Sequence, residues 1–180
     1  MSENERVMLS EKEEIIDIVD ERDCVLRSMP RDIAFAQDIG YRRAVLAFLK
    51  NKQGKLCFLR RAEHLTYLPN HYALVGGCVQ AGELYDDAMK REVAEEVNIE
   101  VISYKKLAIV TPQETQTRLF KALYEVEVDC DELVYCPTAF SSYIWLSPEE
   151  FCDQVKTCQL DPVAPDLCYL MQKFYSLVTE

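Results

Sequence analysis

A carboxylate-rich segment from Gly77 to Ile99 places the strongest constraint on this sequence. Its Glu92, Glu95 and Glu96 follow the spacing i, i+3 and i+4, so in a helix they lie on one face and near a common point. Like charges at this spacing repel one another and reduce helix stability unless a positive group lies among them. A divalent cation such as Mg2+ meets this need, because it prefers oxygen ligands and tolerates a partly hydrated site.

The alternative is an ordinary solvated helix face, on which paired glutamates are common. The segment nevertheless specifies six residues in both type and spacing. They are Gly77, Glu83, Arg91, Glu92, Glu95 and Glu96. At average amino-acid frequencies such a match would arise by chance in on the order of one chain in a hundred thousand. We therefore expect the segment to be functional.

The segment resembles the Nudix box, G-x5-E-x7-R-E-U-x-E-E-x-G-U, in which U is a bulky aliphatic residue. Every position matches except the last glycine, which is Asn98 here. That glycine follows the helix, where a residue in the left-handed conformation commonly ends it, and asparagine is the next most tolerant residue there. We expect Asn98 to support the box structurally and to leave the carboxylates unaffected.

The resemblance implies both a fold and a chemistry. The fold is α+β, a Nudix-type α/β/α sandwich with a mixed β-sheet. Nudix enzymes typically cleave a diphosphate that is linked to another group, with a divalent metal as cofactor, here Mg2+ or Mn2+. The metal withdraws charge from the phosphoryl oxygens and activates the attacking water. The expected substrate is a small anionic diphosphate, of the nucleoside-diphosphate type or a related organic diphosphate.

Position in the box implies a role for each residue. Glu95 and Glu96 are the expected metal ligands, and Glu92 is either the general base or a third ligand. Gly77 resembles the residue whose backbone carbonyl can also reach a metal.

Two further box residues resemble members of an ion-paired bridge. Arg91, which we group with Glu92 as catalytic, resembles the arginine that fixes the box by ion pairing. Glu83 resembles the glutamate that ties the loop to the helix or joins the metal ligands. A purely structural bridge is an equal alternative for Arg91 and Glu83.

The charge of the chain is negative but unevenly distributed. A net charge of −11 argues against binding to nucleic-acid polymers or acidic membranes. Residues 39–62 contain no acid and seven bases, which suggests an anionic ligand between this stretch and the carboxylates. The bases are Arg42, Arg43, Lys50, Lys52, Lys55, Arg60 and Arg61. We expect Arg61 and Arg43 to bind substrate, whereas the three lysines fit a hairpin tip that keeps an edge soluble.

The chain divides into an N-terminal extension over residues 1–37 and a Nudix domain over residues 38–180. A β-hairpin is predicted over residues 14–29, where the apolar run IIDIV precedes a polar turn and a second strand. A hairpin alone is marginal in water, so it must pack on the main domain or on a partner subunit. A homodimer would provide such a partner.

Strands and helices alternate through the main domain, which favours a mixed sheet between helical layers. Strands are expected over 42–50, 55–61, 72–75, 101–111, 117–129 and 142–147, helices over 84–97, from 148 and over 164–178, and a turn over 112–116. Ser147 and Pro148 fit the cap and first position of their helix.

Two alternative functions remain open. Residues 71–77 and 17–31 resemble the subgroup of isopentenyl diphosphate isomerases, which suggests an isomerase. The Asn-Thr-Cys type of segment expected for an isomerase thiol is missing, and His64 and His71 form no obvious metal set with one. The third reading is a non-catalytic Nudix-fold binding module, which the intact acidic set disfavours.

Eight cysteines occur without a CxxC pair, so a zinc ribbon is not expected. The charged N-terminus does not resemble a signal peptide, and no apolar run reaches the ~18 residues of a membrane span. We expect a cytoplasmic protein with reduced cysteines.

Overall fold

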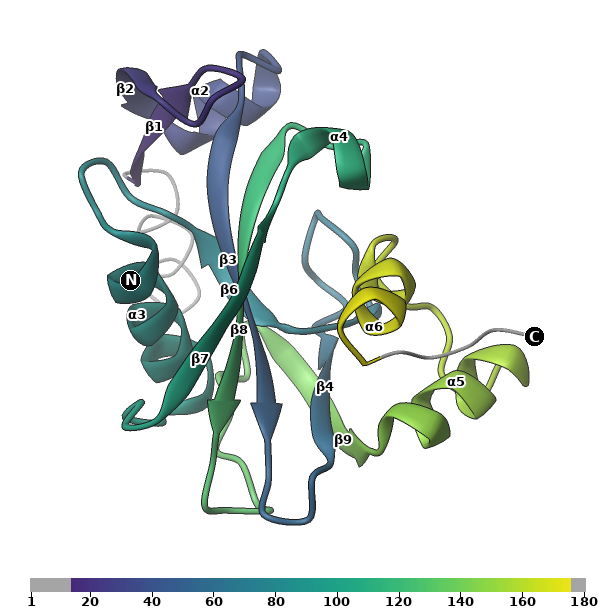
Figure 1. Ribbon diagram of the computed structural model, residues 1–180. Coiled ribbons are helices and arrows are strands. Elements are labelled where there is room, and N and C mark those ends of the chain that lie inside the picture. The colour runs from purple at the N-terminus through teal and green to yellow at the C-terminus, as the bar shows by residue number, and fades with distance from the viewer. Residues whose placement is uncertain (1–13, 176–180) are drawn as a thin grey trace.

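A mixed β-sheet lies between two helical layers, as the sequence predicts (Figure 1). Helix α3 (Tyr85–Val97) covers one face, and helices α5 (Pro148–Lys156) and α6 (Leu167–Tyr175) cover the other. The strands are β3 (Arg42–Lys50), β4 (Leu56–Arg61), β5 (Tyr72–Ala73), β6 (Val75–Cys78), β7 (Tyr104–Val110), β8 (Leu119–Glu127) and β9 (Phe140–Leu146). The α+β sandwich is therefore confirmed.

This computed structural model describes residues 14–175. The predictions for residues 1–13 of the extension, and for 176–178 of the last helix, lie outside the described residues. None of the helices within the described range is long and apolar enough to cross a bilayer.

Strands β3 and β8 form the centre of the sheet and run parallel over nine residue pairs, from Arg42–Leu119 to Lys50–Glu127. Side chains alternate between the two faces of a strand. Val45 and Ala47 of β3 accordingly join the core under α3, whereas Phe48 joins the core under α5 and α6. Burial on both faces explains why RRAVLAFLK is an almost continuous apolar run.

Helix α3 packs an apolar stripe onto this sheet and ends as the sequence predicts. Ala88, Met89, Val93 and Val97 are buried. Asn98 follows with φ 52° and ψ 39°, and its backbone N–H bonds to the carbonyl of Ala94. The left-handed asparagine therefore replaces the usual glycine without altering the helix that carries the carboxylates.

The N-terminal hairpin packs on the main domain. Strands β1 (Ile15–Val19) and β2 (Val25–Pro30) pair antiparallel and lead into the short helix α2 (Arg31–Ala36). Ile16 and Ile18 form a small apolar cluster with Ala34 and Cys78, and Cys78 is the last residue of β6. The hairpin is thus attached beside the Gly77–Ile99 segment (Figure 1).

Two local predictions need correction. The strand predicted over 72–75 is two strands, β5 and β6, and β6 continues to Cys78. The turn predicted over 112–116 is the one-turn helix α4 (Pro112–Thr115), because Thr111 and Glu114 form a capping box around it. The same motif, Ser147 with Glu150, begins α5 as expected.

Candidate active site

The carboxylates lie where β6, the loop after it and α3 meet. Gly77 permits this arrangement, because a Cβ atom at residue 77 would lie 2.4 Å from Oε1 of Glu92. The Glu92 carboxyl group therefore packs directly against the backbone of β6. The adjacent Gly76 donates its backbone N–H to Oε2 of Glu96 at 2.9 Å. The paired glycines thus bring two of the three acids against one strand end.

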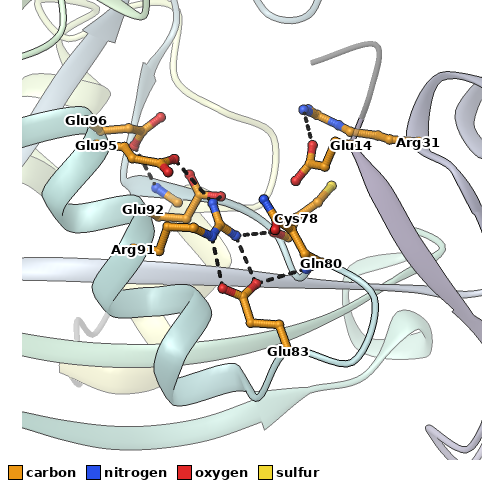
Figure 2. Close-up of polar contacts among 10 residues, drawn as sticks. Glu14, Arg31, Cys78, Gln80, Glu83, Arg91, Glu92, Glu95 and Glu96 are labelled. Carbon is orange, nitrogen blue, oxygen red and sulfur yellow. Dashed lines mark hydrogen bonds and ion pairs between the residues drawn. The ribbon is translucent and has the colours of Figure 1, made fainter. Parts of the chain in front are cut away.

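Arg91 connects the acids to the loop (Figure 2). Its Nε and Nη2 donate to the two carboxylate oxygens of Glu83 at 2.9 and 3.0 Å. Its Nη1 donates to Glu92 at 2.7 Å and to Glu95 at 3.3 Å, and its Nη2 also donates to the carbonyl of Cys78. Burial alone would lower the pKa of Arg91, but the bonds to Glu83 and the charge of Glu92 raise it above the ordinary value. Arg91 therefore remains a fixed positive charge.

Glu83 fastens the loop to the helix. Besides Arg91, its Oε2 accepts the backbone N–H of Gln80 at 2.9 Å. Burial works to raise the pKa of Glu83, but the hydrogen bonds from Arg91 and Gln80 outweigh it and hold the pKa below its ordinary value. Glu83 is therefore a charged link between the loop and α3.

Glu92 is a buried acid of the helix, with 8% of its surface exposed. Burial raises its pKa to about 7 despite the hydrogen bond from Arg91, and the charges of Glu95 and Glu14 contribute in the same direction. A carboxyl group that titrates near neutral pH is suited to proton transfer.

The pKa of Glu96 is raised for similar reasons. Burial raises its pKa well above the ordinary value, and the charge of Glu92 adds to the shift. Charged carboxylates that are both buried and mutually repelling gain from a nearby cation. The oxygen donors of Glu92, Glu95 and Glu96 therefore fit a hard divalent ion.

The acids do not by themselves form a closed metal cage. Within residues 14–175, no three acidic, histidine or cysteine side chains gather closely enough to enclose an ion. Glu92 and Glu95 point to Arg91, Glu96 points to Gly76, and the Glu95 side chain is 60% exposed. Such an open set fits a cation that keeps several water ligands.

Arg61, an expected substrate-binding residue, ends β4 on the side of the acidic centre. Its charge opposes the raised pKa of Glu96, which places the two side chains within electrostatic range. Its Nε donates to the carbonyl of Tyr67 at 3.1 Å, and its guanidinium lies 5.9 Å from the centre of the Tyr67 ring.

Arg43, the other expected substrate-binding residue, makes different contacts. Its Nε donates to Oδ1 of Asp23 at 2.6 Å, and its Nη2 donates to the Asp23 carbonyl. The Tyr85 hydroxyl donates to the same carboxylate, and Arg43 lies 5.5 Å from the Tyr85 ring centre. These contacts favour a role in fastening the hairpin turn over a role in substrate binding.

Sequence reasoning missed the acids that the hairpin brings to the site. Glu14 immediately precedes β1, and its side chain is 10% exposed and paired with Arg31 at 2.9 Å (Figure 2). Its charge contributes to the raised pKa of Glu92, so the two lie within electrostatic range of each other. Residues 14 and 92 are too far apart in sequence for any local spacing rule to connect them.

Comparisons with known proteins agree with the box pattern. A family model described as "NUDIX domain" matches residues 40–167. A "Nudix hydrolase" of Deinococcus radiodurans is 34% identical over 167 residues, covering 91% of this chain and 95% of that protein. "Uncharacterized Nudix hydrolase all7351" of Nostoc sp. is 34% identical over 166 residues, covering 91% and 96%.

Two solved structures are similar to this chain over most of its length. The crystal structure of DR0079 from Deinococcus radiodurans has a TM-score of 0.79 and 33% identity, covering 90% of this chain and 99% of that one. The NUDIX domain of Shewanella oneidensis NrtR, complexed with ADP ribose, has a TM-score of 0.58 and 16% identity, covering 82% and 98%. At 16% identity this second likeness shows the fold alone.

Proposed function

The chain belongs to the Nudix hydrolase family, and from that membership we propose a divalent-metal-dependent hydrolase of a nucleoside-diphosphate-type or related organic diphosphate. The family in general hydrolyses pyrophosphate-containing substrates and uses divalent metal ions. The specific proposal for this chain is Mg2+ or Mn2+ as cofactor. One observation carries it: three carboxylates of α3 gather at one strand end, where Arg91 bonds Glu92 and Glu95 and the backbone N–H of Gly76 bonds Glu96.

The proposed ligands are Glu95 and Glu96, with the backbone carbonyl of Gly77 and with Glu92 as the third acid. When bound, the cation withdraws charge from the phosphoryl oxygens and makes the attacking water more acidic. Arg91 holds Glu92 and Glu95 toward the site through the bonds of its Nη1.

In the proposed reaction, water attacks one phosphorus atom and the bridging P–O bond breaks. Glu92 accepts the proton of the water, a role supported by its burial and by its pKa of about 7. Arg61 binds negative oxygens of the substrate, a role supported by its position near Glu96. The water oxygen stays on the attacked phosphorus and the bridging oxygen leaves with the other, so the diphosphate becomes two phosphate-containing products without any redox step.

The test is hydrolysis of a panel of diphosphates with Mg2+ or Mn2+, followed by chromatography of the phosphate-containing products. ADP ribose belongs in the panel because it is bound by the NUDIX domain of NrtR. Tight binding of one compound without cleavage of any would contradict the hydrolase and favour a binding module.

The carboxylates are tested by Glu95→Gln and Glu96→Gln. Each variant removes one charged oxygen ligand and should lower kcat at least about a hundredfold, with weaker Mn2+ binding in a titration followed by electron paramagnetic resonance. Glu100→Gln is the matched control, because Glu100 is exposed and lies just beyond the helix. Wild-type turnover in both site variants would show that these acids are only part of a solvated helix face.

Isomerase activity is the second candidate, and it is disfavoured because the similar relatives are named as hydrolases. Incubation with isopentenyl diphosphate, followed by product identification, separates isomerisation from phosphate release. We also propose a cytoplasmic location, which the eight free thiols support. The homodimer stays a prediction that sedimentation would test.

A further inference from the structure

The N-terminal hairpin lies along the box loop, by which we mean residues 79–84 between β6 and α3. The backbone N–H of Ala81 donates to the carbonyl of Ile15 at 2.8 Å, and Ile16 forms an antiparallel bridge with Gln80. At the far end of the hairpin, Asp23 accepts the hydroxyl of Tyr85, the first residue of α3. The hairpin therefore contacts the box loop and the first residue of the helix that follows it.

Asp17 makes the most informative of these contacts. It is a buried acid, 7% exposed, in the middle of the apolar strand IIDIV. Its Oδ2 accepts the backbone N–H of Gly82 at 3.0 Å, and its Oδ1 accepts the hydroxyl of Ser28 at 2.6 Å. Both oxygens are thus used, one within the hairpin and one on the box loop.

Packing alone does not account for an acid at this position. A buried carboxylate carries a desolvation penalty that only its hydrogen bonds offset. Its neighbours Ile16 and Ile18 already supply the apolar contact with Cys78 and Ala34. A β-branched apolar residue at 17 would suit the strand better if stability were the only requirement.

The position of Gly82 affects helix α3 through the residue that follows it in the box loop. Gly82 has φ +77°, a conformation that glycine adopts readily, and Glu83 follows it directly. Glu83 holds Arg91 through two hydrogen bonds, and Arg91 in turn holds Glu92. A shift of the loop at Gly82 would therefore displace the group that orients Glu92.

We propose that Asp17 is a positioning residue for the active site: by fixing the Gly82 amide it holds the box loop in the geometry in which Glu83 and Arg91 orient the metal-binding acids. This assignment rests on the proposed function for its kinetic consequences. The N-terminal hairpin then helps to position the active site in addition to packing on the main domain.

The test compares Asp17→Val with Asp17→Asn and with Ser28→Ala. Valine keeps a strand-forming apolar residue but removes the acceptor for Gly82. Asparagine restores an acceptor oxygen for Gly82, and its amide can donate to Ser28. Ser28→Ala is the matched control, since it perturbs the same hairpin and leaves the Asp17–Gly82 bond in place. Asp17→Ala replaces the valine variant if that variant does not fold.

Three readouts are measured on the full chain: Mn2+ affinity, kcat and KM on a hydrolysed diphosphate, and amide exchange at Gly82. Asp17→Val should weaken Mn2+ binding and lower kcat about tenfold each, change KM less than threefold, and accelerate exchange at Gly82. Asp17→Asn and Ser28→Ala should stay within about threefold of wild type in Mn2+ affinity and kcat.

Accelerated exchange at Gly82 with wild-type Mn2+ affinity and kcat would overturn the assignment, because the contact would then be structural only. Equal losses in Asp17→Val and Ser28→Ala would overturn it too, since general loosening of the hairpin would explain both. If wild type hydrolyses no diphosphate, the proposed function fails, and Mn2+ affinity still decides the role of Asp17.

Discussion

Gly77→Ala is the substitution that most directly tests how the site is held together. The added methyl group would lie 2.4 Å from Oε1 of Glu92, 2.5 Å from Cδ and 2.6 Å from Oε2. Ordinary van der Waals contact begins at 3.4 Å, so the carboxyl group must withdraw by about 1 Å. That movement takes Glu92 out of its 2.7 Å bond with Arg91.

The expected effect on activity is much larger than the effect on stability. A misplacement of about 1 Å in a catalytic group can reduce the rate about a hundredfold, which corresponds to about 2.7 kcal/mol in the activation barrier. The obstructed atoms are the end of a flexible side chain, so the fold can adjust by rotating Glu92. We therefore expect the free energy of unfolding to fall by only about 1 kcal/mol.

The assay measures kcat/KM, Mn2+ affinity and urea unfolding for Gly77→Ala, with Gly54→Ala as the control. Gly54 has φ +77° and nothing within 4 Å of an added Cβ, so its substitution strains a remote turn by about 1 kcal/mol. Similar stability losses with a rate loss only in Gly77→Ala would support the argument. Wild-type kcat/KM in Gly77→Ala would refute the inference that the bare backbone at residue 77 fixes Glu92.

Two further predictions concern the arginines and the last helix. Arg61→Ala should raise KM about tenfold in steady-state kinetics. Arg43→Ala should instead lower the melting temperature and change KM less than threefold. A large effect of Arg43→Ala on KM would favour a role for Arg43 in substrate binding. The hydrogen bond from Lys173 is the main cause that lowers the pKa of Glu114 to about 2. Their pair, about one-third exposed, should therefore stabilise the fold above the ordinary pKa of 4.5 and lose its effect as pH falls toward 2. Urea unfolding of Glu114→Gln should show a deficit of about 0.5 kcal/mol at pH 7 that shrinks below pH 4.5, and a deficit unchanged at pH 3 would contradict it.

The features that sequence alone could predict are those encoded by local spacing. The i, i+3, i+4 pattern specifies that Glu92, Glu95 and Glu96 share a helix face whatever surrounds the helix. The same applies to the left-handed Asn98 and to the cap at Ser147, because each depends on a few adjacent residues. Helix α4 carried such a signal too, in Thr111 and Glu114, but its single turn is shorter than periodicity can detect.

The features that could not be predicted depend on contacts between distant segments. Arg43 lies in a basic stretch that suggested an anionic ligand, but the ion that it meets is Asp23, from the hairpin turn. Glu14 and Glu92 are brought together only when the hairpin packs on β6. One signal for the role of the hairpin was nevertheless present, since an aspartate inside IIDIV is out of place in a purely structural strand.

The charge balance of the site explains why the acidic pattern points to a cation. Arg91 is shared among Glu83, Glu92 and Glu95, and Glu96 adds a fourth carboxylate nearby. With Arg61 counted beside Glu96, four negative and two positive charges leave a local excess of two when all are ionised. Glu83 takes two of the hydrogen bonds of Arg91, Glu92 and Glu95 each take one, and Glu96 bonds instead to the backbone N–H of Gly76. Burial is the main cause of the raised pKa values of Glu92 and Glu96, and this charge excess adds to it. A bound divalent cation would reduce the excess without requiring either acid to take up a proton.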